Sequence, residues 1–78
     1  MRSETPPAWV VDRLLALGES VRAAREDQRL TQDDLGRATR LGRSRIEQVE
    51  RGSYDTSLDD LLLIAHALDV SPADLVAE

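Results

Sequence analysis

The chain has 78 residues, enough for one small domain, and a formal net charge of −5. It has no Cys, which excludes disulfides, thiolate metal sites and Cys nucleophiles and fits a cytoplasmic protein. No apolar run approaches the roughly 20 residues that a membrane span needs, and the N-terminal residues do not resemble a signal peptide. A domain of this size buries a thin core, so dimerisation would help to stabilise it.

The charges are unevenly distributed along the chain. Residues 29–54 hold six Arg and four acidic residues, whereas residues 55–78 hold six acidic residues and no Arg. A protein that binds nucleic acid usually has a basic surface, and only the central third can supply one. We therefore expect one phosphate-facing side and an acidic opposite side. The alternative is an ordinary acidic protein, which the charge alone would favour.

Helix-forming residues dominate and no strand pattern competes with them, so an all-α chain of five short helices is predicted. The first helix is expected to begin after Thr5, with Pro6 and Pro7 in its opening turn. Its apolar residues recur at steps of three and four, namely Val10, Leu14, Leu17, Val21 and Ala24. Gly18 interrupts this stripe and can bend or split the helix. Trp9 is expected to be a packing residue of this N-terminal part.

Two short helices follow in the centre of the chain. Thr31, with Asp34 three residues later, forms a capping signal, which predicts a helix to about Thr39. A third helix is predicted over residues 43–50, after a turn of about three residues around 40–42. Two short helices joined by such a turn form a helix-turn-helix, whose second helix enters the major groove of DNA. The inward residues Leu35, Ile46 and Val49 are expected to pack together.

Ser57 and Asp60 repeat the capping signal and open a fourth helix, and Ser71 caps a short fifth helix. The expected buried face of the fourth helix consists of Leu58, Leu61, Leu62, Ala65 and Leu68. More apolar residues remain than one helical face needs, and they are predicted to form a dimer surface: Leu63, Val70, Leu75 and Val76. The alternative is that they complete the core of the monomer.

The single domain, residues 1–78, therefore has three expected parts. They are an N-terminal extension with the first part of helix one (1–17), the helix-turn-helix (31–50), and helices four and five (57–78). The outward face of the third helix is polar and carries Arg43, Ser44, Glu47 and Gln48.

Each residue of this face has a possible role and a simpler alternative. Arg43 can read guanine and Gln48 can read adenine through paired hydrogen bonds; the alternatives are a phosphate contact or a solvated side chain. Glu47 can accept from cytosine, but a surface pair with Arg43 or Arg51 is favoured. Two further basic residues flank this face and are expected to contact phosphate: Arg40 and Arg45.

Three stretches of the sequence carry a family resemblance. They are Leu30-Thr31-Gln32-Asp33-Asp34-Leu35, Val49-Glu50-Arg51-Gly52, and the fourth helix with its Ser57-Leu58 opening. Together they resemble the lambda-repressor-like Cro/CI helix-turn-helix family, without gaps from about Val21 to Leu75. Similar proteins include phage repressors, restriction–modification controller proteins and antitoxins. The resemblance implies a compact five-helix DNA-binding domain.

The resemblance also implies individual roles. Arg43, Ser44 and Gln48 match base-reading positions, and Arg25 and Glu50 match a structural ion pair. The positions that match phosphate contacts are Gln32, Ser53 and Tyr54. Two departures affect the turn: Arg40 replaces a usual Gly and must adopt a positive φ, and Gly42 replaces a capping Ser or Thr. Gly36, where a small Ala is usual, allows close packing but weakens the second helix.

The favoured function is a sequence-specific transcriptional regulator that binds double-stranded DNA as a homodimer on a pseudo-palindromic operator. It would lie in the cytoplasm, on the nucleoid when bound. The alternative is an antitoxin, or another protein-binding module of the same fold, with a toxin or other protein as partner. An enzyme is the least favoured class, because no catalytic constellation, cofactor motif or metal site is present. His66 is expected to be buried or half-buried, since no second ligand keeps metal spacing with it.

Overall fold

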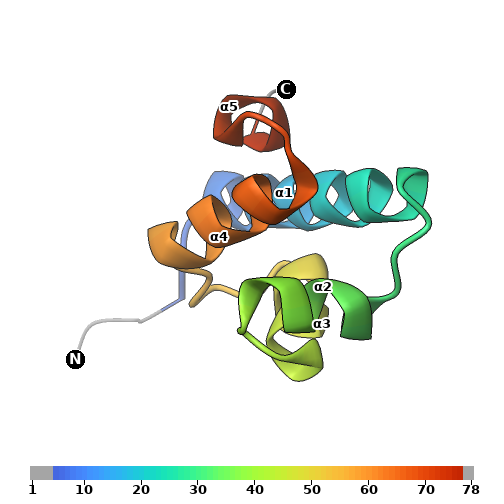
Figure 1. Cartoon of the computed structure of the whole chain (residues 1–78). Coiled ribbons are helices and arrows are strands. Elements are labelled where there is room, and N and C mark those ends of the chain that lie inside the picture. The colour runs from blue at the N-terminus through green and yellow to red at the C-terminus, as the bar shows by residue number, and fades with distance from the viewer. Residues whose placement is uncertain (1–4, 77–78) are drawn as a thin grey trace.

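The computed structural model describes residues 5–76, and this range contains five α-helices and no strand. They are α1 (Ala8–Asp27), α2 (Gln32–Thr39), α3 (Arg43–Glu50), α4 (Leu58–Leu68) and α5 (Pro72–Val76). The predicted all-α fold is confirmed. Figure 1 shows α1 crossing the middle of the molecule, with α5 above it, α4 in front of it, and α2 and α3 below. None of these helices is both long enough and apolar enough to traverse a bilayer.

Two capping boxes begin α2 and α4, as the sequence predicted. The Thr31 hydroxyl accepts from the Asp34 backbone N–H at 2.9 Å, and the Asp34 carboxylate accepts from the Thr31 backbone N–H at 2.9 Å. Ser57 and Asp60 form the same reciprocal pair at 3.1 and 3.0 Å. The bonds from Thr31 favour the ionised form of Asp34, so the pKa of that carboxyl lies below its ordinary value.

The first helix differs from the prediction at two points. Pro6 and Pro7 precede it, with Pro7 at the N-cap. Gly18 does not split α1, which continues through it as one helix. A Cβ at Gly18 would lie 2.5 Å from the backbone oxygen of Glu50, too close for any side chain. The glycine is therefore explained by packing, because it lets the backbone of α1 approach the end of α3.

All five helices contribute to one small core. α1 contacts α3, α4 and α5, while α2 packs on α3 and α4. The buried apolar side chains are Val21, Leu35, Ile46, Val49, Ile64, Ala65, Leu68 and Leu75. The expected packing of Leu35 with Ile46 and Val49 is therefore confirmed, and it fixes the helix-turn-helix onto α1 and α4.

The buried face of α4 was predicted incorrectly in part. Leu58 and Leu62 are exposed, whereas Ile64 is fully buried and Asp60 is nearly so. The buried side of the helix is formed by Ile64, Ala65 and Leu68, with Leu61 partly buried beside them. In the first turn of α4 the buried side chain is the carboxylate of Asp60. It is buried because it both closes the capping box and accepts a hydrogen bond from Arg45 of α3.

Three other expectations about burial are also corrected. Trp9 is 69% exposed rather than packed, and His66 is exposed as well. Leu75 is only 3% exposed and Val70 packs against the core, so these two complete the monomer. Of the four residues predicted to form a dimer surface, only Leu63 and Val76 are exposed.

Candidate nucleic-acid interface

The turn between α2 and α3 is built from two positive φ angles. Arg40 has φ 65° and Gly42 has φ 90°, so the left-handed conformation expected at Arg40 is confirmed. Gly36 allows the two helices to meet closely, since a Cβ there would lie 2.6 Å from the backbone nitrogen of Arg43. The Gly42 N–H donates to the Gly36 carbonyl at 3.1 Å, which closes the turn.

This turn divides α3 into an inner and an outer face. Ile46 and Val49 are buried, whereas Arg43, Ser44 and Gln48 are exposed. The Arg43 guanidinium forms no ion pair within residues 5–76. Glu47 accepts from Arg51 Nη2 at 2.8 Å, which is the surface pair that the sequence favoured.

The C-terminal end of α3 is held in place by the predicted ion pair of Arg25 and Glu50. Arg25 Nε donates to Glu50 Oε2 at 2.7 Å, and Arg25 Nη2 donates to Glu50 Oε1 at 3.0 Å. Glu50 Oε1 also accepts from Gln32 Nε2 at 3.0 Å. The bonds to Glu50 raise the pKa of Arg25 above its ordinary value despite its burial. One carboxylate therefore joins α1, α2 and α3.

Arg45 forms a second connection, between α3 and the start of α4. Its Nε and Nη2 donate to Asp60 Oδ2 at 3.1 and 2.6 Å. Its Nη2 and Nη1 also donate to the Asp55 backbone oxygen at 2.8 Å and to Asp55 Oδ1 at 3.2 Å. The fifth bond runs from Nη1 to Gln48 Oε1 at 3.0 Å. These bonds use all five donors of the guanidinium, so we withdraw its assignment to phosphate.

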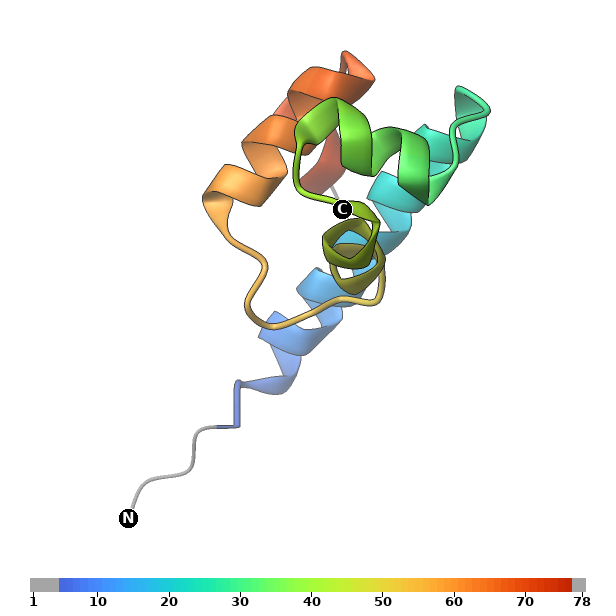
Figure 2. The same cartoon turned by 60° about the horizontal axis from the view of Figure 1, so that its bottom comes forward.

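The two carboxylates around Arg45 are stabilised in their ionised forms. Burial opposes ionisation of Asp60, but hydrogen bonds from Arg45 and Ser57 outweigh it, and its pKa lies below the ordinary value. The pKa of Asp55 is also lowered, first by the Ser53 hydroxyl and then by Arg45. Figure 2 shows the loop of residues 51–57 leading from α3 to α4, and Asp55 lies in this loop.

The other residues predicted to contact phosphate differ in availability. Arg40 is exposed and its guanidinium is unpaired within the described range, and Tyr54 is 63% exposed. Gln32 uses one amide N–H on Glu50, which leaves its second N–H available. The Ser53 hydroxyl donates to Asp55 at 2.5 Å, and its backbone N–H donates to Gln48 at 3.1 Å. Ser53 therefore has no spare donor in this structure.

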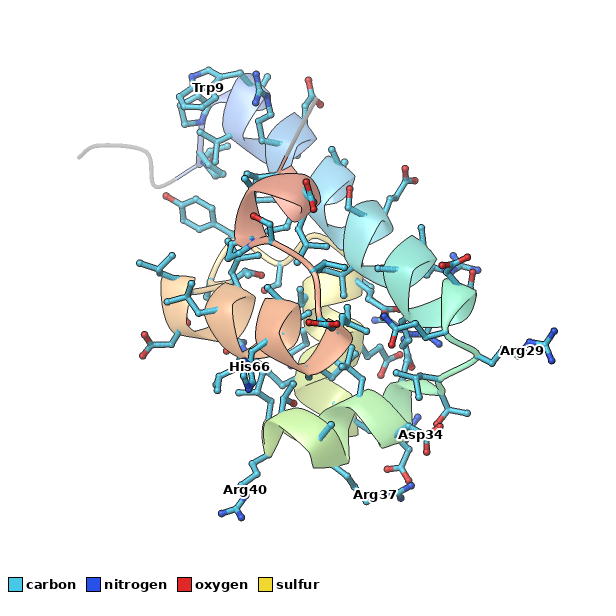
Figure 3. The ribbon with its side chains drawn as sticks, turned by 45° about the horizontal axis from the view of Figure 1, so that its top comes forward. Trp9, Arg29, Asp34, Arg37, Arg40 and His66 are labelled. Atoms are coloured by element: carbon cyan, nitrogen blue, oxygen red, sulfur yellow. The ribbon has the colours of Figure 1, made fainter. Side chains whose placement is uncertain are left out.

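Two basic side chains extend outward from α2 and from its C-cap. Figure 3 shows Arg37 and Arg40 pointing away from the body of the molecule, at the end opposite Trp9. Arg37 is paired with Asp33 and with Asp34. Of these two, Arg40 is thus the cation free to meet an anion.

Sequence reasoning missed two features of this region. It identified Asp60 as a cap but gave no sign that Asp60 binds Arg45, because a contact across 15 residues leaves no periodic signal. It also passed over Arg29, which is exposed and unpaired within residues 5–76 and has φ 61°. Over that same range, no group of three or more His, Asp or Glu side chains could hold a metal ion.

An apolar groove of about 510 Å³ lies between the first half of α1 and α5. Its apolar lining consists of Trp9, Val10, Leu14, Ala16, Leu17, Leu75 and Val76. Arg43, Ser44 and Gln48 are absent from that lining, so the groove is a separate surface from the polar face of α3.

These features define a helix-turn-helix protein: two short helices, a tight turn and a polar outer face on the second helix. The helix-turn-helix family model matches residues 21–75. The chain belongs to the helix-turn-helix family of the Cro/CI type, as its sequence resemblance predicted. This is a family of transcription regulators and not of enzymes.

Two relatives match by sequence. Over 64 residues, which are 82% of this chain, it is 33% identical to the immunity repressor protein of Bacillus phage phi105. Over 52 residues, or 67% of the chain, it is 40% identical to an uncharacterized HTH-type transcriptional regulator of Sinorhizobium fredii. The matched parts are 44% and 26% of those proteins, so the match covers less than half the length of either.

Two solved structures are similar in both fold and sequence. The restriction-modification controller protein C.AhdI from Aeromonas hydrophila has a TM-score of 0.78 at 36% identity, covering 82% of this chain and 97% of that one. The clp gene regulator ClgR from C. glutamicum has a TM-score of 0.75 at 33% identity, covering 81% and 82%. The chain thus corresponds to nearly the whole of the controller protein.

Proposed function

We propose that the protein regulates transcription by binding duplex DNA at specific sequences, with α3 as the recognition helix in the major groove. The observation that carries the proposal is the outer face of α3, where Arg43, Ser44 and Gln48 are exposed while the inner face is fixed to the body. Side chains of these types are suited to reading base edges in the major groove. The similar immunity repressor and controller protein are regulators by name, which supports the proposal.

Contacts to phosphate would position this helix. We assign them to Arg40 and Tyr54, which are exposed and flank α3, and to the second amide N–H of Gln32 at the start of α2. Since the target is DNA, we place the protein in the cytoplasm, on the nucleoid when bound.

We further propose that two copies pair through α4 and α5 and bind a pseudo-palindromic operator. A two-fold dimer of this kind places its recognition helices about 34 Å apart on one side of the duplex. Leu63 is 43% exposed and Val76 is 48% exposed, and with Leu58 and Leu62 they are the large apolar side chains that these helices expose. Sedimentation of the double variant Leu63→Glu Val76→Glu should show monomer at concentrations where wild type is dimeric. Val11→Glu, an exposed change on α1, is the matched control.

Sequence-specific binding can be tested by selecting bound duplexes from a randomised pool and then titrating binding against salt. Wild type should enrich a palindromic site, and the double variant Arg43→Ala Gln48→Ala should lose that preference while keeping its fold. Equal binding of both proteins to all sequences would overturn the proposal.

A second candidate function is a protein-binding module of the same fold, such as an antitoxin. The exposed apolar groove beside Trp9 is the observation that favours it, because small proteins rarely expose such surfaces without a partner. Failure of the selection experiment would direct attention to this groove.

A further inference from the structure

The orientation of the Gln48 side-chain amide is set by its neighbour on α3. Arg45 Nη1 donates a 3.0 Å hydrogen bond to Gln48 Oε1. A guanidinium has donors and no acceptor, so the end of the amide that faces it must be the oxygen. The amide nitrogen, with its two hydrogens, then forms the other end of the side chain.

Arg45 itself is firmly held. Two of its bonds reach Asp60 Oδ2, and the Asp60 side chain is 8% exposed. A third bond reaches the backbone oxygen of Asp55 at 2.8 Å. Arg45 therefore cannot follow Gln48 if the amide rotates, and a rotated amide would lose a charge-assisted bond.

This arrangement affects which base edge suits Gln48. A paired contact to adenine uses both ends of the amide, because Nε2 donates to N7 while Oε1 accepts from the N6 amino group. With Oε1 already bound to Arg45, the adenine amino group would bring a second donor to the same oxygen, beside a positive charge. Guanine instead presents two adjacent acceptors, N7 and O6, which need donors alone.

We propose that Arg45 is a positioning residue that sets Gln48 as a hydrogen-bond donor, so that Gln48 favours guanine over adenine. This inference rests on the proposed function of α3 as the recognition helix. It replaces the adenine contact that the residue type alone suggested.

The test uses the whole chain and its selected operator. The base pair read by Gln48 is the one whose preference the variant Gln48→Ala abolishes. Anisotropy titrations then compare operators that carry guanine or adenine at that position. Wild type should bind the guanine operator about tenfold more tightly, the size of a modest direct contact. The double variant Arg45→Met Asp60→Asn should reduce this ratio to near one.

The double variant removes both charges together, so that no buried carboxylate is left unpaired. Asp55→Ala is the control, because it leaves Arg45 bonded to Asp60 and Gln48 and should preserve the ratio. Circular dichroism checks that each variant folds. If the double variant does not fold, the wild-type ratio still tests whether Gln48 favours guanine over adenine.

Two results would overturn the inference while leaving the proposed function intact. One is adenine binding as well as or better than guanine at the Gln48 position in wild type. The other is a selected operator in which Arg43→Ala changes a base preference and Gln48→Ala changes none. If no operator is selected at all, the recognition-helix proposal fails, and the inference fails with it.

Discussion

Arg25 and Glu50 lie 25 residues apart and bind each other through two hydrogen bonds of 2.7 and 3.0 Å. Their side chains are 10% and 5% exposed. Because Glu50 is the last residue of α3, this pair fixes the C-terminal end of that helix to α1. The proposed recognition helix is thus held by residues that do not lie on its outer face.

Removing one partner of this pair should destabilise the fold strongly. Glu50→Ala leaves the Arg25 guanidinium buried without its carboxylate and also frees Gln32, so we expect a loss of about 3 kcal/mol in the free energy of unfolding. Urea denaturation at neutral pH measures it. Glu47→Ala breaks only the surface pair with Arg51 and should cost less than about 1 kcal/mol. Equal losses in the two variants would contradict this account.

Gly18→Ala should destabilise the protein although alanine is the better helix former. At an open helical position this change would stabilise by about 1 kcal/mol. Here the new methyl would meet the backbone oxygens of Val49 and Glu50 at 2.6 and 2.5 Å, and overpacking of this kind costs about 2 kcal/mol. Thermal unfolding decides the sign. The neighbouring exposed change Glu19→Ala should stay within about 0.5 kcal/mol of wild type.

Stability should fall in acid, and Asp60 should contribute to the fall. Its pKa in the folded protein lies below the ordinary value of 3.8. A lowered carboxyl pKa stabilises the folded state fully above the unfolded pKa, and this stability is lost as the pH falls through the folded pKa. Urea midpoints measured from pH 6 down to pH 2 should therefore decline below about pH 4. The decline should be shallower in Asp60→Asn, and a parallel decline would count against a role for this group.

Arg40 should contribute to DNA affinity without regard to sequence. Because its guanidinium is unpaired, Arg40→Ala should weaken binding to all duplexes alike and reduce the slope of log K against log salt by about one per protomer. Arg37→Ala removes the same charge three residues earlier, in α2, but the Arg37 guanidinium is already bound to Asp33 and Asp34. That control should leave the slope nearly unchanged. Identical slopes in the two variants would show that Arg40 acts only through long-range charge.

Local signals were sufficient for most of the fold. The caps at Thr31 and Ser57 depend on contacts three residues apart, so the sequence alone predicted where α2 and α4 begin. The positive φ of Arg40 followed from the turn that the family resemblance implied. The paired residues Arg25 and Glu50 were likewise identified by resemblance, since nothing local connects them.

Features that depend on tertiary packing were not predictable in the same way. Gly18 reads as a helix breaker in a one-dimensional pattern, and only the crossing of α1 and α3 shows why a side chain is excluded there. Arg45 reads as a surface cation, because its partners Asp55 and Asp60 lie in a loop and in another helix. The exposure of Trp9 depends on how far α1 extends beyond the core, which apolar character does not reveal.

Because α3 is anchored through its inner face and its C-terminal end, its outer face could be changed to recognise new operators. Arg43 and Ser44 make no side-chain hydrogen bond within residues 5–76, so other residues can replace them without altering how the helix docks. Residue 48 is different, because its amide shares a bond with Arg45 and, through it, with Asp60. Retargeting at that position therefore requires exchanging residues 45 and 48 as a unit, whereas positions 43 and 44 can be varied one at a time.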